Sequence, residues 1–176
     1  MIKEKVQKAI NEQIQAELQS AYIYLGMSAY FEENNLEGFA NWMKVQWEEE
    51  IQHAMYFYDH VLRRGGHVEL LNIDPPKLDI KSPKHAFEQA LEHEQYITGR
   101  INDLYELAQE EKDNPFQTLL HWFIDEQVEE EENTDRIRQQ LEMVGDDRTG
   151  LFMLDKEMGQ RQAPQNNAGN DSGQAE

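Results

Sequence analysis

Apolar residues recur every three or four positions along most of the chain, which is the spacing of one face of an α-helix. Residues 4–64 contain no proline, whereas glycine and proline pairs gather in residues 63–83, where this period is lost. Such long uninterrupted patterns are typical of a helical bundle or coiled coil. The pattern predicts helices over about 4–33, 36–64, 83–112 and 115–144, followed by a short helix over about 149–158.

Two of the predicted helices begin with the same pair of residue types. Ser82 stands before Pro83, and Asn114 stands before Pro115. Serine and asparagine are good N-caps, and proline fits the first helical position because its missing amide hydrogen is not needed there. We therefore predict that Ser82 and Asn114 cap the third and fourth helices.

The lengths of the connections predict the topology. The links between the first two helices and between the third and fourth are short, so each pair forms an antiparallel hairpin. The segment 63–83 is long enough to run the length of the bundle. We predict an all-α fold, a four-helix up-down-down-up bundle with a long crossover between helices 2 and 3 and a short fifth helix, within one domain of residues 1–158. Residues 159–176 are polar, and we expect a disordered tail.

Charged residues interrupt the inward stripe of every long helix near its middle. The same offset of 77 positions separates Glu17 from Glu94, Glu50 from Gln127 and His53 from Glu130. It also pairs core positions of the two hairpins, so a pseudo-two-fold relation places these polar residues at one level of the bundle. The six residues at this level are Glu17, Glu50, His53, Glu94, Gln127 and Glu130.

A buried carboxylate is costly unless something compensates its charge. No Lys or Arg of the stripes lies at this level. The four glutamates would balance two divalent cations, and His53 favours iron, manganese or zinc over Ca²⁺ and Mg²⁺. The simpler alternative is a wet or partly protonated polar layer.

Composition narrows the range of partners. The net charge is −19, with 35 acidic and 16 basic residues, which argues against nucleic acid or an anionic membrane and favours cations. The absence of cysteine excludes disulfides and thiolate metal sites. Since the N-terminus has no signal-like apolar region and no apolar run is long enough to cross a membrane, we expect a cytoplasmic protein.

Several motifs resemble those of bacterial non-haem ferritins, within the ferritin-like di-iron carboxylate bundles. Residues 50–53 read "EIQH", a full Glu-x-x-His, and residues 127–130 read "QVEE", the departure from that motif that these ferritins carry. "NEQIQAEL", "EEEIQHAMYFYD", "HEQYIT" and "DEQVEEE" also look like this family, and the similarity covers about residues 5–158. The resemblance implies an iron-storage protein that oxidises Fe(II) with dioxygen or peroxide and keeps ferric mineral in a hollow shell of 24 subunits.

The resemblance also implies ligands and roles. A first iron site would use Glu17, Glu50 and His53, with Glu50 bridging to a second site of Glu94 and Glu130 beside Gln127. Tyr24 would hydrogen-bond a ligand or supply an electron. We expect no haem, because Gln52 stands where the haem-binding methionine of bacterioferritins would be. A third, weaker iron site would use Glu49, Glu126, Glu129 and Glu130.

Other interpretations of these residues stay open. Acidic runs are usually solvated helix faces, and such runs contain Glu49, Glu126 and Glu129. Gln127 can simply hydrogen-bond its neighbours. Tyr24 can be an ordinary core residue. Two other functions also remain. The chain could be a shell subunit that sequesters iron without catalysis, or a peroxide reductase related to rubrerythrins, although those usually add a cysteine-bound iron.

Overall fold

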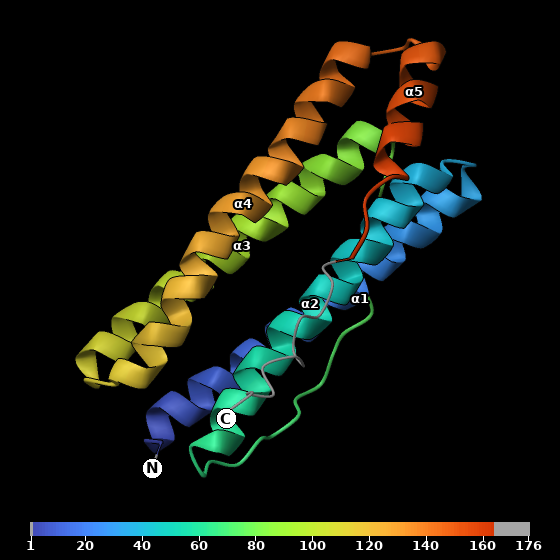
Figure 1. The fold of residues 1–176 in the computed structure, drawn as a ribbon. Helices are drawn as coiled ribbons and strands as arrows, with labels where there is room; N and C mark the ends of the chain where they lie inside the picture. Colours follow the sequence, from blue (N-terminus) through green and yellow to red (C-terminus); the bar gives the residue numbers. More distant parts are fainter. Residues whose placement is uncertain (1, 164–176) are drawn as a thin grey trace, which may run out of the picture.

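The structure is a computed structural model, and it describes residues 2–163 (Figure 1). This part of the chain is helical and contains no strand, which confirms the predicted all-α class. None of its helices is both long and apolar enough to span a membrane. The helices are α1 (Glu4–Glu33), α2 (Glu37–Arg63), α3 (Pro83–Glu110), α4 (Asn114–Val144) and α5 (Arg148–Met158).

The four long helices form two hairpins, α1 with α2 and α3 with α4, and the chain crosses between them along the side of the bundle (Figure 1). The crossover is fastened to α1. Gln19 donates from Nε2 to the carbonyl of Asp74 (2.9 Å) and accepts at Oε1 from the amide of Asp74 (2.8 Å). The up-down-down-up topology with one long crossover is therefore confirmed.

The helix starts show one correction. Ser82 caps α3 as predicted, because its Oγ accepts from the amide of His85 (3.1 Å). The cap of α4 is Asp113 rather than Asn114, since Asp113 Oδ1 accepts from the amide of Phe116 (3.2 Å). The positive φ of Lys112 (53°) turns the chain one residue earlier than expected, so Asn114 is already helical.

A polar layer divides the apolar core into two clusters. One cluster packs around Phe31, Phe39 and Phe87, and the other packs around Phe57 and Phe116. The inward-facing residues, spaced three or four apart along each long helix, are buried, except that Leu91 of α3 and Val144 at the end of α4 are only partly buried. The buried polar residues between the clusters include Gln13, Glu17, Gln46, Glu50, His53, Glu94, Gln127 and Glu130.

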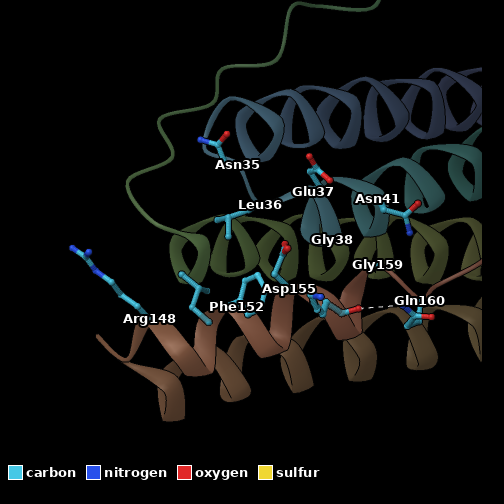
Figure 2. A pocket seen from close by; sticks show the side chains of 12 residues that line it. Asn35, Leu36, Glu37, Gly38, Asn41, Arg148, Phe152, Asp155, Gly159 and Gln160 are labelled. Carbon is cyan, nitrogen blue, oxygen red and sulfur yellow. Dashed lines mark hydrogen bonds between the residues drawn. The ribbon is translucent and has the colours of Figure 1, made fainter.

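The short helix α5 docks against the beginning of α2, beside a surface pocket (Figure 2). A Cβ at Gly38 would lie 1.6 Å from the backbone oxygen of Asp155, so only glycine permits this approach. The side chain of Asp155 accepts from the amide of Phe39 (3.0 Å) and thus caps α2, which has no side-chain cap of its own. After α5, the chain therefore continues alongside α2, where Arg161 contacts Asn41 and Gln46. The rest of the expected tail, residues 164–176, lies outside the described residues.

Candidate metal centre

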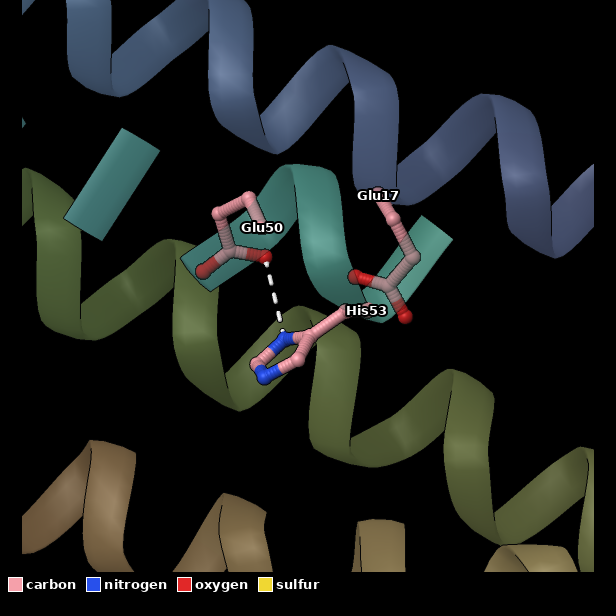
Figure 3. Close-up of side chains that lie close together, drawn as sticks. All are labelled: Glu17, Glu50 and His53. Carbon is pink, nitrogen blue, oxygen red and sulfur yellow. Dashed lines mark ion pairs between the residues drawn. The ribbon is translucent and has the colours of Figure 1, made fainter. Parts of the chain in front are cut away.

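Three ligand-type side chains meet in the buried layer between α1 and α2. Glu17 comes from α1, whereas Glu50 and His53 lie one turn apart on α2 (Figure 3). One ligand atom of each lies within 4.8 Å of those of the other two. An ion pair joins His53 Nδ1 and Glu50 Oε2 at 3.5 Å. These are the residues that the sequence predicts for the first metal site.

Two buried glutamines support these carboxylates. Gln13 Nε2 donates to Glu17 Oε1 (2.8 Å), and Gln46 Nε2 donates both to Glu50 Oε1 (3.1 Å) and to Glu130 Oε2 (2.8 Å). Neither glutamine is among the site residues predicted from the sequence. Each stands four residues before its glutamate on the same helix, and this repeated Gln-x-x-x-Glu spacing is the signal that would have found them.

Glu94, on α3, is enclosed by hydrogen bonds. The hydroxyl of Tyr24 donates a short hydrogen bond to Glu94 Oε1, and Gln127 Nε2 donates to Glu94 Oε2 (3.3 Å). Burial, reinforced by the charge of Glu94, raises the pKa of Tyr24 well above its ordinary value, so Tyr24 is a neutral donor here. Glu94 belongs to neither of the three-residue ligand groups found among the described residues.

A second ligand group reaches from the layer toward the surface. It contains His53, Glu130 and Glu126, again within 4.8 Å, and Glu126 Oε1 lies 3.9 Å from His53 Nε2. Glu49 is partly buried and forms an ion pair with Arg161. Glu129 is exposed, and no ligand group within residues 2–163 includes it.

The carboxylates of the layer differ in proton affinity. Burial, followed by the charge of Glu50, raises the pKa of Glu17 and of Glu130 to about 8. The same two causes raise the pKa of Glu94 well above its ordinary value. Without a bound cation, Glu17 and Glu130 therefore hold protons near neutral pH.

Glu50 and His53 form the charged pair of the layer. Burial alone would raise the pKa of Glu50, but the hydrogen bond and charge of His53 outweigh burial and lower it. Burial would likewise lower the pKa of His53, yet the hydrogen bond to Glu50 and its charge raise it to about 10. A divalent cation entering this layer would replace the proton on His53 as well as those on the neighbouring glutamates.

The donor set fits a transition metal. Glu17 Oε2 is buried and has no hydrogen-bond partner among the described residues, so this oxygen is available to a metal ion. Carboxylate oxygens together with an imidazole nitrogen suit iron, manganese or zinc. The residues present can therefore hold such an ion.

A bundle of four helices with carboxylate and histidine ligands at mid-length defines a class of metal-binding helical proteins. The model of the ferritin-like domain matches residues 7–144, and the chain belongs to this family. Bacterial non-heme ferritin of Bacteroides fragilis (strain 638R) is 42% identical over 161 residues, which is 92% of this chain and 100% of the relative. Bacterial non-heme ferritin of Staphylococcus aureus (strain USA300) is 36% identical and covers 92% of this chain and 97% of its own length.

Solved structures agree with this assignment. A ferritin of Archaeoglobus fulgidus, engineered into a closed form, superposes with a TM-score of 0.92 at 46% identity, over 93% of this chain and 100% of that chain. An open-pore ferritin of the same archaeon gives a TM-score of 0.91 at 46% identity, over 92% and 100% of the two chains. The family resemblance drawn from the motifs is therefore confirmed.

Proposed function

We propose that the chain is an iron-storage ferritin that oxidises Fe²⁺ at a centre within each subunit and keeps the ferric product inside a shell of 24 copies. The observation that carries this proposal is the buried group of Glu17, Glu50 and His53, in which Glu17 Oε2 has no hydrogen-bond partner among the described residues. The names of the similar proteins support iron as the substrate, and the net charge of −19 favours the concentration of cations.

The centre would hold two Fe²⁺ ions as substrates. Glu17, Glu50 and His53 would bind the first, and Glu94 and Glu130 would bind the second, with Glu50 shared. Each ion can give up one electron, so two adjacent ions supply the pair that reduces dioxygen to peroxide or peroxide to water. Tyr24 and Gln127 would hold and release Glu94. Glu49, Glu126, Glu129 and Glu130 would form a third, weaker site.

The two main sites differ in how much their ligands must rearrange before a metal ion can bind. The ligands of the first already converge, whereas Glu94 is held by Tyr24 and Gln127 and must exchange a hydrogen bond for a metal. Protons leave the layer when cations bind, because Glu17 and Glu130 are protonated near neutral pH without them. We infer that the first site fills before the second.

Two further expectations remain proposals. We propose a cytoplasmic protein, in keeping with the acidic composition and the absence of cysteine. We also propose that the subunits bind no haem, because Gln52 offers no thioether at the position where a haem ligand would stand.

One observation favours a second candidate, a shell subunit that sequesters iron with little catalysis. Glu94 is occupied by hydrogen bonds and lies outside both ligand groups of the described residues. If Glu94 kept these hydrogen bonds and bound no metal, only one Fe²⁺ would bind tightly. The centre would then supply one electron at a time instead of the two that dioxygen or peroxide takes up. Rapid oxidation therefore separates the two candidates.

The test is to add Fe²⁺ to the metal-free protein in air and to follow ferric absorbance and particle size. We expect a fast phase and a soluble, iron-loaded particle of 24 subunits. Glu50→Ala removes the shared ligand and should slow the fast phase by at least about 100-fold. Glu48→Ala is the matched control, because Glu48 is an exposed glutamate of the same helix. A Glu50→Ala protein that oxidises iron at the wild-type rate would refute the assignment, and a monomeric or dimeric particle would refute storage.

A further inference from the structure

Arg161 follows the end of α5 and returns to the side of α2. Its carbonyl accepts a hydrogen bond from Asn41 Nδ2 (3.0 Å), and its guanidinium carbon lies 4.3 Å from the centre of the Trp42 ring. Nη1 also approaches the carbonyl of Trp42 at 3.5 Å. These contacts with α2 involve no acidic group, so they position the arginine independently of the charges in the centre.

The head of Arg161 contacts two side chains next to the metal centre. Nη1 donates to Gln46 Oε1 (2.9 Å), and Nη2 forms a close ion pair with the carboxylate of Glu49. Within residues 2–163, no other Lys or Arg forms an ion pair with an acidic residue assigned to the iron sites. Arg161 thus brings a positive charge to the α2 side of this level, while Arg100 Nε donates to Gln13 Oε1 (2.8 Å) on the α1 side.

The contact with Gln46 reaches both halves of the centre. A guanidinium can only donate hydrogen bonds, so it holds the oxygen of the Gln46 amide and turns the amide nitrogen the other way. That nitrogen donates to Glu50 (3.1 Å) and to Glu130 (2.8 Å). One buried amide therefore links the position of Arg161 to two carboxylates on different helices.

The contact with Glu49 has a different consequence. Arg161 Nη2 donates to Oε2 of Glu49, and its positive charge repels any cation that approaches the same carboxylate, so the two compete for Glu49. Glu49 is partly buried, and Arg161 already occupies its Oε2 in the metal-free subunit.

We propose that Arg161 is a positioning residue of the iron centre and a tethered cation: it orients Gln46 toward Glu50 and Glu130, and it competes with a metal ion for Glu49. The inference rests on the proposed function, in which Glu49 belongs to the third, weaker site. Filling of that site is then coupled to movement of the Arg161 guanidinium, while the hydrogen bond from Asn41 to its carbonyl keeps the backbone of Arg161 on α2. In the metal-free subunit the arginine occupies Oε2 of Glu49.

The test measures metal affinity rather than iron oxidation. Metal-free wild type and the variants Arg161→Gln, Arg161→Lys and Lys156→Gln are titrated with Co²⁺ by calorimetry as the full-length assembled protein. Lys156→Gln removes one positive charge from the exposed side of α5, where Lys156 lies over Phe152 and touches neither Gln46 nor Glu49. It controls for the general effect of charge.

Opposite changes are expected at the two kinds of site. Arg161→Gln should bind the weakest Co²⁺ about fivefold more tightly, because the competing charge-assisted contact is gone. It should bind the tight Co²⁺ ions about threefold more weakly, because Gln46 loses its orientation. Arg161→Lys keeps the charge and should restore the weak affinity to within about twofold of wild type, and Lys156→Gln should stay within about twofold at every site.

Three outcomes would overturn the proposal. The first is an unchanged or weaker affinity at the weak site in Arg161→Gln while the tight sites bind as in wild type, a result that leaves the proposed function standing. The second is an equal tightening in Lys156→Gln, and the third is no restoration by Arg161→Lys. Failure of the proposed function itself has a separate signature, since the wild type would then bind no tight pair of Co²⁺ ions.

Discussion

The two hairpins of the bundle repeat each other's register and differ in the chemistry they bring to its centre. Positions 77 residues apart correspond, yet α1 and α2 supply the histidine, whereas α4 has Glu130 at the matching position. The supporting residues differ still more. The positions that correspond to Gln13, Gln46 and Tyr24 of the first hairpin are Ala90, Phe123 and Ile101 in the second.

Because of this difference, side chains of the first hairpin donate hydrogen bonds to carboxylates of both hairpins. Gln13 and Gln46 satisfy the carboxylates of their own helices, while Gln46 also reaches Glu130 and Tyr24 reaches Glu94. The second hairpin adds Gln127 and otherwise offers apolar side chains at these positions. The two hairpins thus share a register, but most of the polar side chains that hold the candidate ligands lie in the first hairpin, and the second contributes Gln127 and Arg100, which donates to Gln13.

The largest expected effect comes from removing the residue that most distinguishes the hairpins. His53→Ala should weaken binding of the first Co²⁺ by at least about 100-fold, because loss of a ligand costs more than loss of an outer partner. The corresponding change in the second hairpin, Glu130→Ala, should leave the first ion bound and weaken the second. Calorimetric titration of the metal-free proteins checks this, and equal loss of the first ion in both variants would contradict the asymmetry.

The buried carboxylates should make the metal-free protein less stable as pH rises. The pKa of Glu17 and of Glu130 is about 8 in the folded state against an ordinary 4.5, so the folded state holds these protons more tightly. The resulting stabilisation is complete below about pH 4.5 and is lost as pH rises to about 8. His53 acts in the same direction from 6.5 to about 10, whereas the lowered pKa of Glu50 opposes it.

Replacing Glu17 or Glu130 by glutamine should remove the loss of stability at high pH, because an amide side chain has no carboxyl proton to release. Glu17→Gln and Glu130→Gln, one in each hairpin, should each raise metal-free stability at pH 8 by about 1–3 kcal/mol relative to wild type. At pH 4.5 the difference should be small. Calorimetric unfolding at both pH values checks this, with Glu48→Gln on the surface as control. A variant less stable than wild type at pH 8 would contradict protonation of that residue.

The smallest expected effect tests the bond that the first hairpin makes to Glu94. Tyr24→Phe removes one hydrogen bond from the metal-free state and should lower its stability by about 1 kcal/mol. The second Co²⁺ should then bind about fivefold more tightly, because Glu94 no longer gives up that bond when it turns to the metal. An unchanged second affinity would mean that Tyr24 keeps its bond to Glu94 in the loaded centre.

Much of this centre was predictable from single helices. A ligand pair such as Glu50 and His53 lies one turn apart on one helix, so helical geometry alone brings it together. The start of α4 was placed one residue late, because the turn at Lys112 depends on a backbone conformation that no side-chain pattern announces. Arg161 carried no signal at all, since it stands in a polar segment that looks detached from the bundle.

The amino-acid sequence by itself determined the helices, their inward faces and the level at which the acidic residues meet. Those features follow from a period of 3.6 residues and from the cost of burying a charge, and both act locally. The tertiary structure alone decided which polar groups hold the ligands. Tyr24 and Glu94 are 70 residues apart, Gln46 and Glu130 are 84 apart, and Arg161 and Gln46 are 115 apart. Contacts over such separations exist only once the helices have packed, because the packing sets the distance between their side chains.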